Sequence, residues 1–306
     1  MARTAVTSTQ FRRDATVGQG YSTTSNIAWG GSVPSQVDAY FPAGSNRPVI
    51  GIIKGSWCDG TVKTGTDLVA MGRSFAALGF TVFVPNFLVV TGCTGNTATT
   101  FRQGIIDDVL SFMTWMRANA ATYNGDVTKI ALIGHSAGGQ LALMAGVQGT
   151  ASTTRPDAIV GYSPATRLDR THFAGGQSHA AVGPYIENYL GMAADVPSTS
   201  GAAIAQSFSP YNQTLTNLPA IRLVCHATEP DLGIPQSDID DMHTVAVAAS
   251  VDSTKRVITG SIHNTYAGAD IEGTASWLRD KLRWTPPTAA RGSGGTRASA
   301  GTRTAA

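Results

Sequence analysis

One stretch, residues 129–147, constrains the fold of this chain more than any other. It reads Lys-Ile-Ala-Leu-Ile-Gly-His-Ser-Ala-Gly-Gly-Gln-Leu-Ala-Leu-Met-Ala-Gly-Val. Its first half is an apolar run typical of a strand buried on both faces, and its second half has apolar residues at helical spacing. Between them, Gly134-His135-Ser136-Ala137-Gly138 matches G-x-S-x-G, the turn that lifts a serine hydroxyl clear of a sheet. Glycine is expected at 134 and 138 because a side chain there would collide with the neighbouring strand or helix.

The rest of the chain repeats this alternation of strand, turn and helix. Gln36–Tyr40 alternates polar and apolar residues, which predicts an antiparallel edge strand. Apolar runs predict further strands, and helical periodicity predicts helices between them. The predicted strands are 48–53, 81–85, 157–162, 220–226 and 255–259, and the predicted helices are 67–78, 101–121, 239–249 and 271–282. The order predicts an α/β fold with a mostly parallel central sheet and helices on both faces.

This pattern also divides the chain into segments. Residues 1–24 are polar and are interpreted as a loosely structured N-terminal arm, followed by one domain over 25–284. Within it, residues 166–216 break the rhythm and contain one short predicted helix, 185–190, so they are interpreted as an insertion over the carboxyl edge of the sheet. Residues 285–306 lack periodicity and are predicted to be a disordered tail.

Composition excludes two classes of partner. The formal net charge is +2, and Arg291, Arg297 and Arg303 stand in the tail with no acid beside them, so nucleic-acid binding is not expected. No segment approaches the roughly eighteen apolar residues of a membrane span.

The N-terminus shows no signal-peptide hydrophobic region, which favours a cytoplasmic protein or part of a larger assembly, with export possible if a leader was removed. The sequence leaves the oligomeric state open.

A nucleophilic Ser136 requires a base and a group that orients the base. In sheets of this type these residues follow in the order serine, acid, histidine. His263 stands in a loop right after the last predicted strand, past every candidate acid, and is the predicted base. The loop after strand 220–226 offers two acids, Glu229 and Asp231, and the residues alone do not choose between them.

The reaction also requires backbone N–H groups aimed at the developing oxyanion. One is expected from Ala137, the residue after the nucleophile. The others are expected from Ser56 and Trp57, in the turn after an early central strand, where Gly55 allows close approach. The bulky Trp57, facing the same edge as Ser136, and His135 in the elbow are the predicted substrate-binding residues.

Residues from about Gln36 to Leu282 resemble the α/β-hydrolase superfamily, in particular the carboxylesterase group of hormone-sensitive-lipase-like, feruloyl and acetyl-xylan esterases and arylformamidases. The elbow carries the resemblance, together with its lead-in Asp126-Val127-Thr128-Lys129-Ile130. Further matches are Asp107-Asp108, Trp115, Tyr189-Leu190-Gly191, Ser209-Pro210 and the loops at 231–235 and 263. The resemblance implies a serine hydrolase that cleaves small-molecule or polymer-linked carboxylic esters through an acyl-enzyme, with no metal or organic cofactor.

The chain departs from the group's pattern at two places. Lys54-Gly55-Ser56 stands where the group usually has His-Gly-Gly. The acid loop carries one residue more than the common pattern between His226 and Pro235. Counting back from Pro235 favours Asp231, whereas counting forward from His226 favours neither acid. The predicted triad is therefore Ser136, Asp231 and His263.

Several alternatives accompany this prediction. A non-catalytic binding or structural module of a larger assembly is one, although a complete serine, acid and histidine set argues against it. An amide-cleaving formamidase or a polyester depolymerase would use the same triad.

Short acyl chains are expected, because the insertion has no long amphipathic lid helix and Trp57 would narrow the pocket. Cys58 and Cys93 both follow central strands, so a disulfide between them is predicted, whereas Cys225 is interpreted as a core residue.

Overall fold

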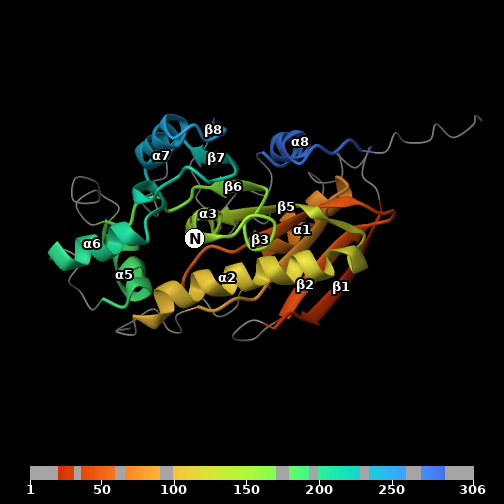
Figure 1. Cartoon of the computed structure of the whole chain (residues 1–306), viewed down its shortest axis with the longest axis horizontal. Helices are drawn as coiled ribbons and strands as arrows, with labels where there is room; N and C mark the ends of the chain where they lie inside the picture. The colour runs from red at the N-terminus through yellow and green to blue at the C-terminus, as the bar shows by residue number, and fades with distance from the viewer. Residues whose placement is uncertain are drawn as a thin grey trace, which may run out of the picture.

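The computed structural model describes residues 20–30, 36–58, 66–89, 99–169, 179–192, 199–227, 234–259 and 270–286. Its centre is a sheet with the strand order β1-β2-β4-β3-β5-β6-β7-β8 (Figure 1). The strands are β1 (Tyr21–Ala28), β2 (Gln36–Pro42), β3 (Arg47–Ile53), β4 (Thr81–Pro85), β5 (Gly125–His135), β6 (Ala158–Tyr162), β7 (Ala220–His226) and β8 (Ser253–Ile258). All strand pairs from β4 to β8 are parallel, and the pairs β1·β2 and β2·β4 are antiparallel. The predicted mostly parallel sheet is confirmed.

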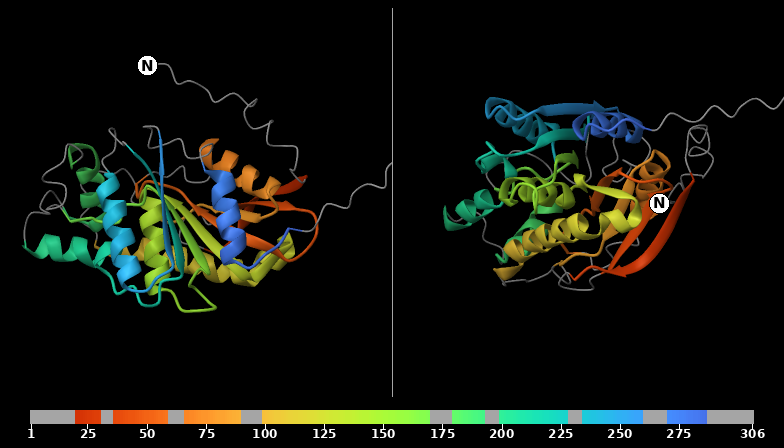
Figure 2. Two further views of the ribbon diagram at one scale, coloured as in Figure 1. Left: turned by 90° about the horizontal axis from the view of Figure 1, so that it is seen from above. Right: turned by 45° about the vertical axis from the view of Figure 1, so that its right-hand side comes forward.

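Helices cover both faces of this sheet (Figure 2). Buried side chains of α1 (Thr66–Ala77) and α8 (Ile271–Lys281) share one apolar cluster with the sheet. Those of α2 (Thr100–Asn119), α3 (Ala137–Gln148) and α7 (Gln236–Ala248) share a second cluster. The central strands are buried along their length because each face meets helices, which explains their continuous apolar runs.

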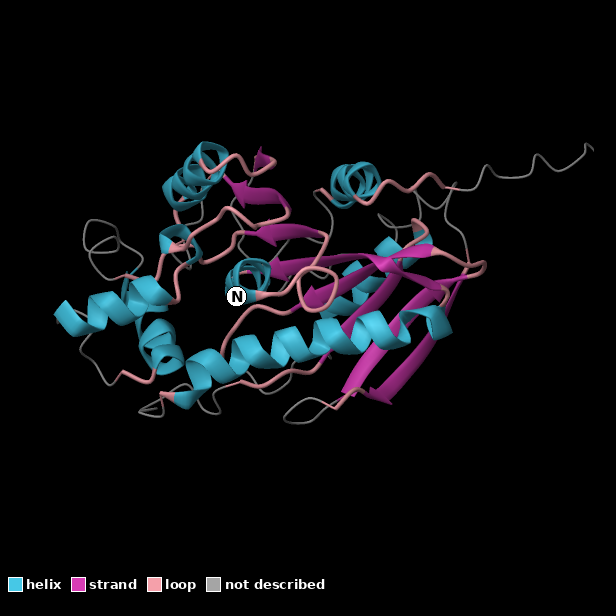
Figure 3. Cartoon of the chain, viewed as in Figure 1, coloured by secondary structure: helices cyan, strands magenta, loops and turns pink. Residues whose placement is uncertain are grey.

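The described helices of the predicted insertion lie on the side to which the arrowheads of the neighbouring parallel strands point (Figure 3). The insertion contains α5 (His179–Leu190), α6 (Thr199–Ser207) and a short 3₁₀ turn, Pro210–Asn212, so it holds more helix than the sequence predicts (Figure 3). Arg102, near the start of α2, donates a hydrogen bond to the Leu190 carbonyl oxygen at 3.1 Å. The end of α5 therefore contacts the start of α2.

The N-terminal part of the sheet corrects two predictions. Strand β1 begins at Tyr21, inside the predicted arm, and it pairs with β2 on the side away from β4. The predicted edge strand 36–40 is therefore antiparallel, as expected, but it is not at the edge. Nearly every residue of β1 is exposed, so the strand has no apolar alternation that sequence reasoning could detect.

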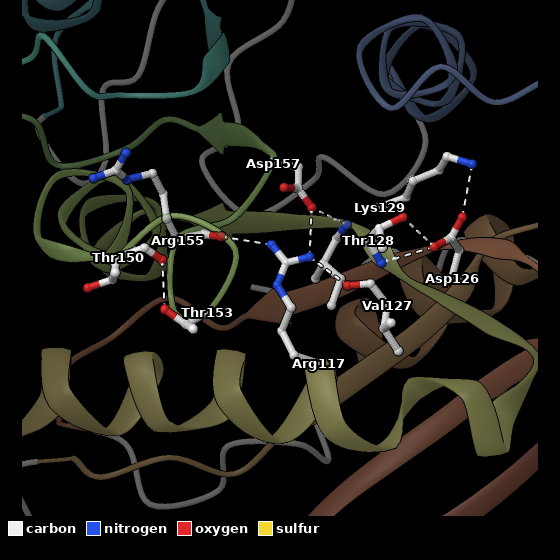
Figure 4. A network of polar contacts seen from close by, with 10 residues as sticks. Arg117, Asp126, Val127, Thr128, Lys129, Thr150, Thr153, Arg155 and Asp157 are labelled. Carbon is white, nitrogen blue, oxygen red and sulfur yellow. Dashed lines mark hydrogen bonds and ion pairs between the residues drawn. The ribbon is translucent and has the colours of Figure 1, made fainter.

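Polar contacts fix the start of β5, at the end of the strand opposite to Ser136 (Figure 4). Asp157 accepts a hydrogen bond from the Ile130 N–H at 2.8 Å and forms an ion pair with Arg117 at 3.0 Å. Asp126 accepts hydrogen bonds from Thr128 and pairs with Lys129 at 2.9 Å. The lead-in to the elbow thus has a structural role, since it sets where β5 begins relative to α2 and β6.

A search of the described helices for a membrane span found none with both the length and the apolar character required.

Candidate active site

Ser136 occupies a sharp turn between a strand and a helix. It follows the last residue of β5 and precedes the first residue of α3, with φ 54° and ψ −121°. A positive φ is unusual for a residue with a side chain, and such strain costs on the order of 1–3 kcal/mol. Hydrogen bonds hold the turn: the Ser136 N–H donates to the Tyr162 carbonyl at 2.9 Å, and the Ser136 carbonyl accepts from Gly139 and Gln140. The serine is only partly buried.

The two glycines of the elbow are required sterically, as the sequence predicts. A Cβ atom at Gly134 would lie 2.1 Å from the Gly138 carbonyl oxygen, and a Cβ atom at Gly138 would lie 2.2 Å from the Ile53 carbonyl oxygen. Both obstacles are backbone atoms, so no side-chain movement relieves them. The start of α3 therefore packs directly against the end of β3.

This contact leads to a prediction about stability. Gly138→Ala is expected to lower the free energy of unfolding by about 3 kcal/mol, because the methyl group must push β3 and α3 apart. Gly104→Ala in α2 is the matched control, since its Cβ atom would meet only the end of the Leu88 side chain, at 3.3 Å. That variant is expected to stay within about 1 kcal/mol of the wild type. Urea unfolding of the two variants measures the difference, and equal stabilities would contradict the steric argument.

The turn after β3 lies against the nucleophile. A Cβ atom at Gly55 would be 3.2 Å from the Ser136 Cβ and 3.0 Å from the His135 carbonyl oxygen. Ser56 has φ 79°, and its hydroxyl oxygen accepts a hydrogen bond from the Cys58 N–H at 3.2 Å. On the other side, Ala137 is the first residue of α3, and the first N–H groups of a helix have no partner within the helix. The structure thus places Gly55, which precedes the predicted donors Ser56 and Trp57, against Ser136, and Ala137 directly after it. Their role as oxyanion donors stays a prediction.

The side chain of Trp57 requires a correction. Its indole is 3% exposed, stacks on Tyr189 with 4.9 Å between ring centroids, and donates a hydrogen bond to the Gln140 side chain. It therefore belongs to the core beneath the turn, whereas the sequence analysis expected the indole to narrow a substrate pocket. Sequence reasoning identified the correct edge of the sheet but not the side on which the ring packs.

His135 is the last residue of β5 and pairs with Tyr162 of β6. Its Nδ1 would lie 3.0 Å from a Cβ atom at Gly55, so the imidazole packs close to the turn after β3. The side chain is partly exposed beside Ser136. Its predicted contact with substrate stays a prediction.

The predicted base and both candidate acids, His263, Asp231 and Glu229, lie outside the described residues. The strands before their loops are described: β7 ends at His226 and β8 at Ile258. Both run parallel to β6, which itself runs parallel to β5. Strands β7 and β8 therefore end at the same edge of the sheet as β5. The predicted triad of Ser136, Asp231 and His263 stays a prediction.

Asp238 is a buried carboxylate that the sequence analysis did not identify. It stands in the first turn of α7 and is 1% exposed. Its pKa is raised to about 8, chiefly by burial; the charge of Arg167 lowers the pKa, and the charges of Asp241 and Asp169 raise it. Arg167 bridges Asp169 and Asp241 at 3.5 and 3.2 Å. From sequence, Asp238 looks like an ordinary acid at a helix start, and only tertiary contacts bury it.

The cysteines agree in part with the predicted pairing. Cys58 is disulfide-bonded, whereas Cys225 is buried and is not part of a disulfide. Cys93, the predicted partner of Cys58, lies outside the described residues. Within the described ranges, no group of three or more histidine, cysteine, aspartate or glutamate side chains is placed to hold a metal ion.

Solved structures with the same fold are esterases of low sequence identity. A truncated carbohydrate esterase from gut microbiota is 17% identical, with a TM-score of 0.69 over 87% of this chain and 99% of the other. Esterase B from Lactobacillus rhamnosis is 17% identical, with a TM-score of 0.63 over 89% of each chain. Est2, a thermophilic esterase from the Planctomycetes species Thermogutta terrifontis, is 16% identical, with a TM-score of 0.62 over 91% of this chain and 99% of the other. At these identities the likeness shows the α/β-hydrolase fold.

A search of curated protein sequences found no match. The BD-FAE family model matches residues 37–238, which is more than half of the chain and includes the turn after β3 and the Ser136 elbow. The chain therefore belongs to the BD-FAE family of α/β-hydrolase-type esterase domains and is a carboxylic ester hydrolase.

Proposed function

We propose that this esterase cleaves its substrate through an acyl-enzyme on Ser136, with His263 as the base and Asp231 as the group that orients it. The proposed substrates are small-molecule or polymer-linked carboxylic esters with short acyl chains. The backbone N–H groups of Ser56 or Trp57 and of Ala137 stabilise the oxyanion.

One observation carries this proposal. The Gly55 turn lies against the strained elbow of Ser136, with its α-carbon so close that a side chain would touch the Ser136 Cβ. If the elbow had only a structural role, the Gly55 turn would not need to lie this close to the serine. An acyl-transfer site requires this closeness, because donors must reach the oxygen that becomes charged when the hydroxyl adds to a carbonyl.

The chemistry proceeds in two stages. Ser136 Oγ adds to the ester carbonyl while His263 accepts the hydroxyl proton, and the resulting oxyanion accepts hydrogen bonds from the backbone donors. Collapse of this intermediate expels the alcohol, which takes the proton from His263 and leaves an acyl group on Ser136. Water then repeats the sequence, which releases the carboxylic acid and regenerates the serine.

Covalent labelling tests the proposal directly. Diethyl p-nitrophenyl phosphate is expected to release one equivalent of p-nitrophenol, to add a diethyl phosphoryl group to the peptide that contains Ser136, and to abolish hydrolysis of p-nitrophenyl acetate. Labelling at another residue, or full activity after Ser136 has been labelled, would overturn the assignment. A protein that neither hydrolyses the ester nor reacts would favour a binding module.

Short acyl chains are expected to be preferred. The described helices of the insertion, α5 and α6, are twelve and nine residues long, so neither is a long lid helix. The Est2 structures with the same fold contain propionate and butyrate. We expect kcat/KM for p-nitrophenyl acetate or butyrate to exceed that for the decanoate by about 10-fold or more, since pockets discriminate by one to three kcal/mol per misfitting group. A rising kcat/KM from butyrate to decanoate would contradict this expectation.

A further inference from the structure

The side chain of Trp57 connects the turn after β3 to helix α3. Its indole N–H donates to Gln140 Oε1 at 3.1 Å, and its ring stacks on Tyr189 of α5 with an interplanar angle of 8°. Both partners are fully buried, so neither contact is weakened by solvent. The residue next to the strained Ser56 is thus anchored at its ring rather than only through its backbone.

Gln140 uses both ends of its amide. The oxygen accepts from Trp57, and the nitrogen donates to the Phe208 carbonyl at 2.9 Å and reaches the Tyr189 hydroxyl at 3.4 Å. Tyr189 in turn donates to the Arg102 carbonyl at 3.1 Å. The buried amide of Gln140 therefore links the turn after β3 to the insertion, and Tyr189 extends this link to α2.

The position of Gln140 in α3 gives this junction a consequence for catalysis. Gln140 is the fourth residue of the helix that begins with Ala137, so it is rigidly connected to the Ala137 N–H. The Gln140 side chain also holds the turn that carries the second set of donors. The Gln140 side chain therefore adds a second link between the turn and α3, besides the backbone packing of α3 on the end of β3. Misplacing a donor by about 1 Å can cost about 100-fold in rate.

We propose that Gln140 is a positioning residue that fixes the turn carrying Ser56 and Trp57 relative to α3, and thereby aligns the two sides of the oxyanion site. This inference rests on the proposed function of Ser136. Gln140 touches neither substrate nor reacting atoms in this role, and acts through the Trp57 indole.

The test uses Gln140→Met and Trp57→Phe. Gln140→Met keeps the length of the side chain and removes both hydrogen-bonding atoms, and Trp57→Phe keeps an aromatic ring and removes the N–H. Each is expected to lower kcat for p-nitrophenyl acetate by about 10-fold or more and to weaken a butylboronic acid inhibitor, which forms a tetrahedral adduct, by a similar factor. KM is expected to change less than about three-fold. The double variant is expected to be no worse than the poorer single variant.

Trp29→Phe is the matched control. Trp29 is also buried and donates its indole N–H to a backbone carbonyl, that of Asn86, at 3.0 Å. Its loss is expected to lower the melting temperature without changing kcat or inhibitor affinity. Variants of Gln140 and Trp57 that lose only thermal stability, as this control does, would overturn the positioning role while leaving the proposed function intact. A wild-type protein without esterase activity would overturn both.

Discussion

Ser136→Ala is expected to lower kcat for p-nitrophenyl acetate by a factor on the order of 10⁶, the largest effect of any single substitution in this chain. The reason is that the variant has no atom that can form the acyl-enzyme, so only the binding site and the oxyanion donors remain. The fold should survive, because the hydrogen bonds that hold the elbow use the backbone N–H and carbonyl of residue 136 and not its hydroxyl. Single-turnover kinetics and mass spectrometry after labelling measure the loss.

Ser250→Ala provides a control at another serine with a positive φ. Ser250 also has a positive φ, 62°, but it is exposed at the end of α7. Both substitutions place alanine at a positive φ, so each carries a local backbone cost. Only Ser136→Ala should lose activity. Residual hydrolysis within about 10-fold of the wild type would show that another nucleophile, or water activated directly, performs the reaction.

Asp231→Asn is expected to lower kcat by a factor on the order of 10⁴, which corresponds to about 5 kcal/mol of activation free energy. An orienting carboxylate holds the imidazole of His263 in the required tautomer and stabilises the imidazolium that forms when Ser136 loses its proton. Asparagine occupies nearly the same volume, but its amide cannot perform both tasks. The melting temperature should change little, since the substitution alters charge and not packing.

Glu229→Gln in the same loop is the matched control. Pro230 follows Glu229 and restricts the backbone of that residue to extended conformations, whereas Asp231 comes after it. The glutamine variant is expected to keep kcat within about three-fold of the wild type, because an acid outside the triad takes no part in orienting the imidazole. If Glu229→Gln is the inactive variant instead, Glu229 is the triad acid. Near-normal rates in both variants would place the acid elsewhere.

The sequence by itself determined the central strands, the elbow and the overall class of the fold. Strands β3, β4 and β6 and the second half of β5 are buried, and such strands appear in sequence as continuous apolar runs. The elbow was identifiable because its glycines are demanded by the backbone of the adjacent β3 and α3, and a steric demand of this kind admits one residue type.

Tertiary structure decided the parts whose partners are distant in the chain. β1 is polar and exposed, so only its pairing with β2 makes it a strand. The Trp57 ring and the Gln140 amide are 83 positions apart, and nothing near either residue predicts that they meet. Asp238 is an ordinary helix-start acid until the segment after β6 packs over it. Local periodicity reports which face of an element is apolar, but a buried polar contact depends on which two surfaces come together, and that depends on the assembled fold.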